Sequence, residues 1–382
     1  MGIAGKLEET GAKAMGLMPR IIRNPVISIA NAARLMRIKR LKTPINLTLY
    51  VTSRCNANCK HCFYKSELNK KEEELSLQQI KTIAKTLKHP LKTLMITGGE
   101  PFLRNDVPEI CGAFLKNNRT RRISIATNGM LTQKIIESVK TLLKSCRQLH
   151  VQISLDGPED IHDNMRAVEG CYQKATATLR ELEILQNKHK NFQVSILTTI
   201  CKLNYRHLAA FSKGIKKEFP SILHKFNIVR GSRTGTFGLP EDITSSLETE
   251  AELLTPKELE SLFNELSKNV SGHKDDIWAK FQKLKWFYSI EMLRSRKKLF
   301  NCLAGHTFGV IYSNGNVSMC EPSIPFANLK DYDYNFYKLW NSKKAKEMRK
   351  KLSHCFCIHP CNLLDSMAYD TKSIQHIFNN KN

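Results

Sequence analysis

Three cysteines in the first part of the chain have types and spacing that could do chemistry. Cys55, Cys59 and Cys62 form a C-x3-C-x2-C pattern within the stretch VTSRCNANCKHCFY, residues 51–64. Thiolates at such a spacing can form a redox pair with one cysteine left over, part of a zinc site, or part of an iron–sulfur cluster. A structural zinc site needs a fourth ligand, whereas a cluster held by three cysteines leaves one iron open to a substrate. The spacing alone favours an iron–sulfur cluster over a zinc site, but it does not exclude zinc.

A second group of cysteines lies near the C-terminus. It comprises Cys302, Cys320, Cys355, Cys357 and Cys361. The stretch TFGVIYSNGNVSMC predicts a β-hairpin that turns at Asn314-Gly315, which would bring Cys302 and Cys320 together. Cysteine pairs on hairpins also bind structural zinc, so zinc stays an alternative here. Two separate groups of cysteines predict two separate metal centres.

The other cysteines occur singly in helix-like or strand-like segments, and we expect buried, inert thiols. They are Cys111, Cys146, Cys171 and Cys201. The chain shows no signal-peptide pattern and no apolar run long enough to span a bilayer. Together these features predict a cytoplasmic protein rather than a disulfide-bonded secreted one.

The elements that must position the first cysteines are apolar strands alternating with amphipathic helices. Six such units follow one another between residues 45 and 231. This pattern is typical of a parallel α/β layout, and six units fit a partial (β/α)6 TIM-like barrel better than a closed eightfold one. Functional groups then belong at the C-terminal ends of the strands. The cysteine loop follows the first strand, and the motif MITGGEP ends the second.

These two motifs in combination resemble the radical S-adenosylmethionine (SAM) superfamily over about residues 45–231. The resemblance implies that Cys55, Cys59 and Cys62 bind a [4Fe–4S] cluster whose open iron is chelated by the amino and carboxylate groups of SAM. Reductive cleavage of SAM would then give a 5′-deoxyadenosyl radical, which takes a hydrogen atom from a substrate. An external one-electron donor such as flavodoxin or ferredoxin is also implied.

The resemblance also implies which residues bind SAM. They are His61 near the adenine, Gly98, Gly99 and Glu100 at the methionyl amino group, and Thr127, Asn128, Ser154 and Asp156 near the ribose and carboxylate. The dipeptides Asn128-Gly129 and Asp156-Gly157 are also ordinary turn formers, so that role stays open for them. Arg166 could reach the SAM carboxylate, but we expect it to form a surface ion pair.

Placed after such a barrel, the C-terminal pattern resembles the SPASM/twitch extensions that carry auxiliary [4Fe–4S] clusters. A full SPASM domain uses about seven cysteines for two clusters, and five occur here. The resemblance therefore implies one auxiliary cluster. Its ligands would be Cys302, Cys320 and Cys361, with either Cys355 or Cys357 as the fourth.

We predict four segments along the chain. They are a basic amphipathic N-terminal segment (1–44), the barrel (45–231), a helical connector (232–300) and a small SPASM/twitch-like domain (301–382). The first segment is expected to dock on the protein's own barrel. The alternative is a helix lying on an anionic membrane, because basic residues flank its apolar face.

The formal net charge of +25 predicts attraction to an acidic partner without identifying it. The expected function is a radical SAM enzyme acting on an unidentified peptide, carbohydrate or lipid-linked substrate, with no general base evident. The first 44 residues are too short for a winged-helix peptide-recognition domain, and their basic character leans toward envelope lipids or glycans. The alternative is a basic nucleic-acid-binding protein with two structural zinc sites. No recognition-helix motif occurs, so we expect no nucleic-acid partner.

Overall fold

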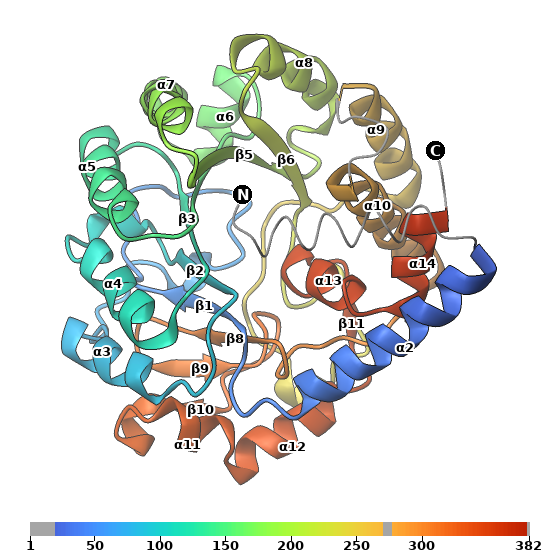
Figure 1. Cartoon of the computed structure of the whole chain (residues 1–382). Helices are drawn as coiled ribbons and strands as arrows, with labels where there is room; N and C mark the ends of the chain where they lie inside the picture. Colours follow the sequence, from blue (N-terminus) through green and yellow to red (C-terminus); the bar gives the residue numbers. More distant parts are fainter. Residues whose placement is uncertain (1–19, 270–276, 380–382) are drawn as a thin grey trace.

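Six parallel strands, neighbours in chain order, form the centre of the computed structural model, which describes residues 20–269 and 277–379. The strands are β1 (Asn46–Tyr50), β2 (Thr93–Thr97), β3 (Arg122–Thr127), β4 (Leu149–Ser154), β5 (Phe192–Ile200) and β6 (Leu223–Ile228). They curve into an open barrel, which confirms the predicted fold class (Figure 1). Predictions for residues 1–19 lie outside the described residues.

Helices form the outer layer of this barrel (Figure 1). They are α3 (Leu77–Thr86), α4 (Val107–Asn118), α5 (Thr132–Leu143), α6 (Glu159–Arg166), α7 (Cys171–Lys188) and α8 (Leu208–Glu218). Helix α3 begins at Ser76, whose side chain accepts from the Gln79 backbone in a capping box. Alternate strand residues such as Leu94 and Ile96 are fully buried in the apolar core. Because successive side chains of a strand point to opposite faces of the sheet, these alternate residues all lie on the face that packs against the helices.

The C-terminal cysteine-rich region joins the barrel through its main chain. The predicted hairpin is confirmed: β8 (Phe308–Ile311) and β9 (Asn316–Ser318) pair antiparallel, and Gly315 turns between them with φ of +87°. Strand β8 also pairs parallel with β1, so one nine-stranded sheet runs from β10 (Ala327–Asn328) to β6. The SPASM-like region therefore extends the barrel sheet.

The described part of the predicted connector contains two α-helices, a short 3-10 helix and one short strand. Helix α9 (Pro256–Asn269) starts with Thr255 and Glu258 hydrogen-bonded in a capping box, and α10 (Ile277–Ser295) follows. The connector predicted as helical also includes β7 (Thr236–Phe237), which pairs antiparallel with β11 (Phe356–Cys357). Strands of two residues carry no periodic signal, so this pairing could not be expected. The boundaries between the four segments stay predictions.

The other α-helices of the described part of the chain lie around the β10 edge and on the open side of the sheet (Figure 1). They are α2 (Arg20–Lys39), α11 (Phe336–Trp340), α12 (Lys343–Leu352), α13 (Pro360–Met367) and α14 (Thr371–Asn379). Helix α2 docks on its own chain: the Asn31 amide donates to the Tyr369 carbonyl at 2.6 Å and to the Thr371 hydroxyl at 3.0 Å. Helix α2 therefore packs against α14, and not against a helix of the barrel on which the sequence predicts it to dock. Among the described residues, no helix is both long and apolar enough to cross a bilayer.

Two lysines lie close together on the inner side of β6 without a carboxylate partner among the described residues. Lys285 of α10 is buried and donates to the Phe226 carbonyl at 2.9 Å. Nζ of Lys225 lies 3.3 Å from Nε2 of His150 on β4. Burial, helped by the charge of Lys225, lowers the pKa of Lys285 to about 7, and burial with the charge of Arg122 lowers that of Lys225 to about 8.

Replacing Lys285 by methionine is expected to raise the free energy of unfolding at pH 7 by about 1–3 kcal/mol, because an uncompensated buried charge is removed. The unfolded chain binds more protons than the folded chain between the folded pKa, about 7, and the ordinary lysine pKa of 10.5. Stability should therefore rise with pH across this window, and Lys285→Met should flatten the rise. Urea unfolding at pH 7 and 9 measures both effects, with exposed Lys140→Met on α5 as the control. If Lys285→Met lowered the free energy of unfolding at pH 7 and left its dependence on pH unchanged, the prediction would be wrong.

Candidate functional site

The first cysteine loop rests directly on the end of β2. The Gly99 amide donates to the Thr52 carbonyl at 2.9 Å. A Cβ on Gly99 would lie 2.1 Å from the Arg54 carbonyl oxygen and 2.9 Å from Cβ of Cys55. Gly98 has a φ of +146°, and a Cβ there would lie 2.3 Å from the Thr52 oxygen. The two glycines are therefore what allows the two strand ends to touch.

Gly99→Ala is expected to lower the free energy of unfolding by about 1–3 kcal/mol, because backbone atoms of the cysteine loop must move away from the new methyl group. Iron bound after reconstitution should fall with it. Gly112→Ala on α4 is the matched control, since a Cβ there meets nothing within 4 Å. That control should gain about 1 kcal/mol from better helix propensity. Equal effects of the two substitutions on urea unfolding and iron content would show that close packing at Gly99 is unimportant.

Glu100 joins the ends of β2 and β3. Its buried carboxylate accepts hydrogen bonds from the Thr127 hydroxyl and the Asn128 amide, both at 2.8 Å, and from the Phe102 amide at 3.2 Å. Burial raises the pKa of Glu100 to about 7, although these hydrogen bonds act in the opposite direction. The Glu100 carboxylate thus already accepts several hydrogen bonds from neighbouring groups of the protein. Its contact with the methionyl amino group of SAM stays a prediction.

The end of β3 also reaches the cysteine loop. The Asn128 side-chain amide donates to the side-chain oxygen of Asn56 at 2.8 Å. Gly129 completes the turn with a φ of +79°, so the turn-forming role that the dipeptide suggested is present as well. On the next strand, Ser154 is the last residue of β4 and is partly exposed. Contacts of Asn128 and Ser154 with the ribose or carboxylate of SAM stay predictions.

Asp156 and Arg166 form a buried ion pair beneath the cysteine loop. Nε of Arg166 donates to Oδ2 of Asp156 at 2.8 Å, the Thr199 amide donates to Oδ1 at 2.9 Å, and Nε2 of His61 lies 3.5 Å from Oδ2. Burial alone would raise the pKa of Asp156, but the Arg166 guanidinium outweighs it and the pKa falls to about 2. The expectation of a surface ion pair for Arg166 is wrong, because this end of α6 packs under the loop.

Arg166 also contacts one of the three thiols. Its second guanidinium nitrogen lies 3.6 Å from Sγ of Cys59, and its carbonyl accepts from the Asn58 amide at 3.2 Å. Burial raises the pKa of Cys55 to about 11 and of Cys62 to about 12, and in both cases the nearby Cys59 adds to the shift. Thiols of this kind give up their protons when a metal takes their place. The three residues therefore fit a [4Fe–4S] cluster.

The imidazole ring of His61, the residue before Cys62, has one nitrogen that is available to a bound molecule. Its Nε2 faces Asp156, whereas Nδ1 is buried and has no hydrogen-bond partner among the described residues. Burial lowers the pKa of His61 to about 4. Buried polar atoms are rarely left unpaired, and those that are often mark a site completed by a bound molecule. The observation fits the predicted position of His61 near the adenine of SAM, which stays a prediction.

Arg104 is a site residue that the sequence did not single out. It donates to the Val51 carbonyl at 2.9 Å and to the Leu75 carbonyl at 2.8 Å, and its Nε pairs with Asp106 at 2.6 Å. The arginine thereby fixes the backbone where the cysteine loop leaves β1. Its position four residues after Glu100, within GGEPFLR, is the one signal that could have pointed to it.

Three thiols of the second cysteine group come together. Burial raises the pKa of Cys355 to about 12 with an added effect of Cys302, and it raises the pKa of Cys320 with added effects of Cys355 and Cys302. The charge of Cys302 thus acts on both Cys320 and Cys355. Cys357 lies on β11, opposite Thr236 of β7. Cys361 lies on α13, but its side chain is outside the described part of the chain.

Aromatic rings lie between the two cysteine groups. Tyr64, next to the first loop, is stacked with Tyr312 at a centroid distance of 5.8 Å, and its ring centroid lies 4.7 Å from that of Tyr50. The Tyr50 hydroxyl donates to the buried carboxylate of Glu321 at 2.6 Å. Glu321 directly follows Cys320. The two cysteine groups are therefore linked through packed, buried side chains.

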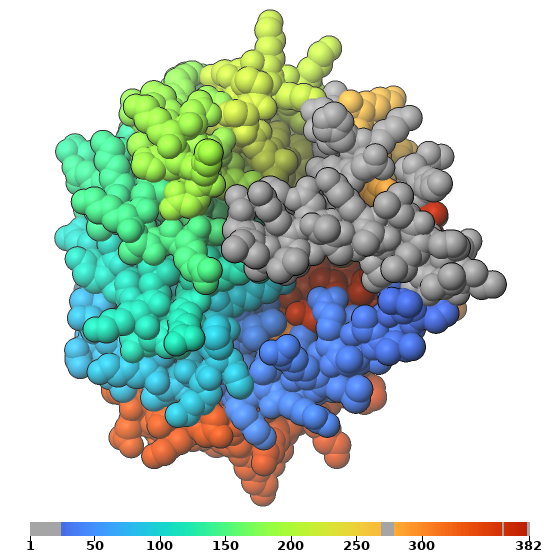
Figure 2. All heavy atoms as spheres, viewed as in Figure 1, coloured from blue at the N-terminus to red at the C-terminus, as the bar shows by residue number. Residues whose placement is uncertain are grey.

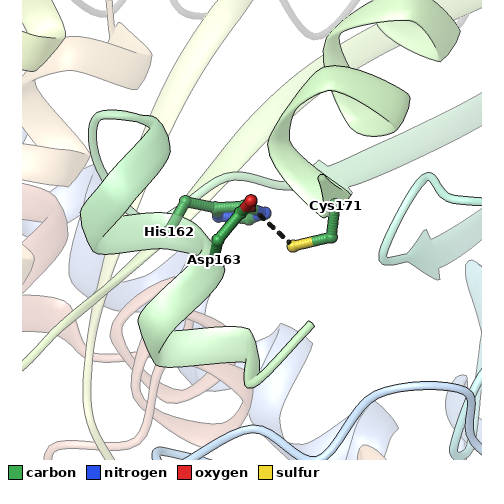
Figure 3. Close-up of side chains that lie close together, drawn as sticks. All are labelled: His162, Asp163 and Cys171. Carbon is green, nitrogen blue, oxygen red and sulfur yellow. Dashed lines mark hydrogen bonds between the residues drawn. The ribbon is translucent and has the colours of Figure 1, made fainter. Parts of the chain in front are cut away.

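A further set of metal-binding residue types lies at the junction of α6 and α7 (Figure 3). Ligand atoms of His162, Asp163 and Cys171 all lie within 4.8 Å of one another. The Asp163 carboxylate, however, already accepts from Sγ of Cys171 at 3.2 Å, from the Gly170 amide at 2.6 Å and from the Tyr172 amide at 2.8 Å. These bonds cap the start of α7, which accounts for the cluster without a metal. The predicted burial is confirmed for all four single cysteines, Cys111, Cys146, Cys171 and Cys201.

Comparison with protein families identifies the class that this fold and site define. Residues 49–212 match the family model of the radical SAM superfamily, and residues 302–363 match SPASM, an iron–sulfur cluster-binding domain. The chain belongs to the radical SAM superfamily and carries a C-terminal SPASM domain. The first implies a [4Fe–4S] cluster and SAM, and the second implies auxiliary iron–sulfur clusters. The alternative of a zinc-containing nucleic-acid-binding protein is not supported.

Individual relatives show how far the likeness extends. An Fe-coproporphyrin III synthase of Methanosarcina barkeri is 29% identical over 213 residues, which cover 56% of this chain and 50% of the relative. An AdoMet-dependent heme synthase of Oleidesulfovibrio alaskensis is 24% identical over 80% of this chain and 78% of its own. The solved structure of anSMEcpe with bound AdoMet and Cp18Cys peptide has a TM-score of 0.55 and 20% identity over 80% of this chain and 82% of that one. The chain spans about half the length of the first of these relatives.

Proposed function

We propose that this protein is a radical SAM enzyme that removes a hydrogen atom from an organic substrate and uses an auxiliary [4Fe–4S] cluster in its SPASM domain. One observation carries the proposal. The C-x3-C-x2-C loop and the GGE segment are hydrogen-bonded side by side at the carboxyl ends of β1 and β2. When bound, the first cluster and SAM supply a one-electron cleavage that yields a 5′-deoxyadenosyl radical.

The chain's own residues hold and orient these groups. Cys55, Cys59 and Cys62 are proposed to ligate the cluster and leave one iron to SAM. Arg166, fixed by Asp156, donates toward Sγ of Cys59 and so orients that ligand. Cys59, Asp156 and Arg166 are buried, which excludes water from this side of the reacting centre.

In the SPASM domain, we assign Cys302, Cys320, Cys355 and Cys361 as ligands of the auxiliary cluster. Cys302 contributes to the raised pKa of both Cys320 and Cys355, which supports Cys355 as a ligand. Cys355→Ala should lower the iron content by about four atoms per chain, whereas Cys357→Ala should leave it unchanged. Iron and sulfide determination on both reconstituted variants checks this assignment. The opposite pattern would make Cys357 the ligand.

The substrate is proposed to be a peptide, a carbohydrate or a lipid-linked molecule. The peptide present in the anSMEcpe structure supports the first class, whereas the two curated relatives bear the names of an Fe-coproporphyrin III synthase and a heme synthase. Peptides are therefore the first class to test. An external flavodoxin or ferredoxin is the proposed electron donor. The predicted contact with an anionic membrane concerns helix α2 and is independent of the substrate.

Anaerobic reconstitution followed by incubation with SAM and dithionite tests the chemistry. We expect a brown protein with about eight irons per chain and release of 5′-deoxyadenosine. Two tightly held zinc ions per chain, with no cleavage of SAM, would overturn the proposal.

Fractionated, deuterium-labelled cell extract then tests the substrate class. The fraction that transfers deuterium into 5′-deoxyadenosine contains the substrate. If peptide fractions give no transfer while another fraction does, peptide modification is excluded.

A further inference from the structure

Helix α2 has an outward face that other described segments leave exposed. Val26, Ile29 and Met36 on this face are 39%, 72% and 58% exposed, and Ala33 between them is exposed as well. Spacings of three and four residues place all four side chains on one side of the helix. In Figure 2 the blue spheres of α2 lie at the molecular surface. The apolar stripe covers about three helical turns.

The opposite face of α2 is already occupied by the protein. Ile27, Asn31 and Ile38 are buried, and Asn31 makes the two hydrogen bonds that attach the helix to the start of α14. Arg34 adds a cation–π contact, with its guanidinium carbon 4.7 Å from the centre of the Tyr369 ring. The orientation of α2 is thus fixed by internal contacts, and the apolar stripe is held outward.

Positive charge gathers at the C-terminal end of the exposed face. Arg37, Lys39, Arg40 and Lys42 are all exposed, and none forms an ion pair with an acid in the described part of the chain. A surface hollow of about 410 Å³ lies at this end. It is lined by Ala33, Met36, Arg37, Arg40, Leu41 and His89. The hollow therefore combines an apolar floor with cationic side chains.

We propose that helix α2 binds the surface of a membrane that contains anionic phospholipids. The helix would lie parallel to the membrane, with Val26, Ile29, Ala33 and Met36 at the boundary between headgroups and acyl chains. Arg37 and Arg40 would meet the phosphate groups. An amphipathic helix with an apolar face and unpaired basic residues fits an anionic interface, because apolar burial and charge attraction act together.

Other occupants fit this face less well. In a symmetric dimer the same face would meet itself, and α2 contains no acidic residue that could pair with Arg37 or Arg40 across such a contact. A nucleic acid would pair with the arginines but would leave the apolar side chains of Ile29 and Met36 without a suitable partner. An anionic lipid surface satisfies both parts of the face.

Co-sedimentation of the full-length protein with vesicles tests the proposal. Vesicles of phosphatidylcholine alone are compared with vesicles that also contain phosphatidylglycerol, at low and high sodium chloride. We expect binding to the anionic vesicles, weakened by salt, and little binding to the neutral ones. Equal sedimentation with both vesicles, or with neither, would overturn the proposal. Membrane binding requires neither cluster nor SAM, so this result stands apart from the enzymatic proposal.

Matched variants locate the binding surface. Ile29→Glu with Met36→Glu should weaken vesicle binding at least about tenfold, whereas Ile184→Glu, at a residue of α7 that is 49% exposed, should not change it. Arg37→Gln with Arg40→Gln should also weaken binding about tenfold or more. Lys140→Gln with Lys144→Gln on the surface of α5 is the control with the same change in charge. Circular dichroism shows whether each variant remains folded.

Three results would overturn the proposal, and the first two would assign the face to another occupant. The first is a dimer in light scattering that Ile29→Glu with Met36→Glu converts to a monomer. The second is vesicle binding that appears only after removal of residues 1–19, which would mean that the chain covers this face itself. The third is loss of vesicle binding by the α5 control variant to the same extent as by the arginine variant.

Discussion

Cys59→Ala is expected to lower the release of 5′-deoxyadenosine from SAM by at least about a thousandfold. The substitution removes one of three thiols that the loop offers, and it also removes the contact at 3.6 Å between Sγ and the Arg166 guanidinium. The iron content should fall by about half, because the auxiliary cluster depends on a different set of cysteines. Chromatography of the nucleoside product and iron determination on the same reconstituted sample measure both effects.

A matched control is Cys146→Ala, since Cys146 is also buried but lies at the end of α5, outside both cysteine groups. That variant should keep the full iron content and the full rate of SAM cleavage. If Cys59→Ala retained nucleoside release close to that of Cys146→Ala, the assignment of the first loop as the SAM-binding centre would be wrong.

Asp156→Asn is expected to lower the free energy of unfolding by about 3–5 kcal/mol, because it leaves the Arg166 guanidinium buried without its counter-charge. Asp156 is fully buried and also accepts from the Thr199 amide at 2.9 Å, so its loss affects the ends of β4 and β5 together. SAM cleavage should fall as well, since Arg166 would no longer be held against Cys59. Urea unfolding and nucleoside release are the two measurements.

The control for this substitution is Asp242→Asn, which breaks an ion pair with Lys351 whose two side chains are 48% and 59% exposed. An exposed pair of this kind contributes about 0–1 kcal/mol. Combining Asp156→Asn with Arg166→Met should recover part of the lost stability, because the buried charge is then removed. A double variant less stable than Asp156→Asn alone would show that the lost stability does not come from an unpaired arginine.

The barrel and the position of the first site could be predicted from the sequence because both depend on local signals. Each strand and its helix are contiguous, and a right-handed crossover places successive strands next to one another. A motif that follows a strand is thereby assigned to the carboxyl edge. Cys55 after β1, Glu100 after β2 and Asn128 after β3 were all located in this way.

The contacts that stabilise the site could not be predicted in the same way, because their partners lie far apart in the chain. Arg166 was expected at the surface, since nothing near it in sequence reveals that the end of α6 packs under Cys59. Arg104 was not singled out because its acceptors are backbone carbonyls of Val51 and Leu75, which any residue type could provide.

The choice between Cys355 and Cys357 was undecidable for a related reason. It depends on where β11 pairs with β7, and two strands of two residues each carry no pattern that sets their register. In the structure Cys357 lies opposite Thr236 of β7, while Cys302 and Cys355 both act electrostatically on Cys320.

The parallel pairing of β8 with β1 has a consequence for how the protein is made. Strand β1 precedes the first cysteine loop and is synthesised long before its second neighbour, which lies at residues 308–311. Until residues 308–311 leave the ribosome, β1 presents an open row of amide and carbonyl groups to any passing chain. Assembly of the barrel is thus timed by the SPASM region, and a chain truncated before β8 is expected to accumulate in inclusion bodies.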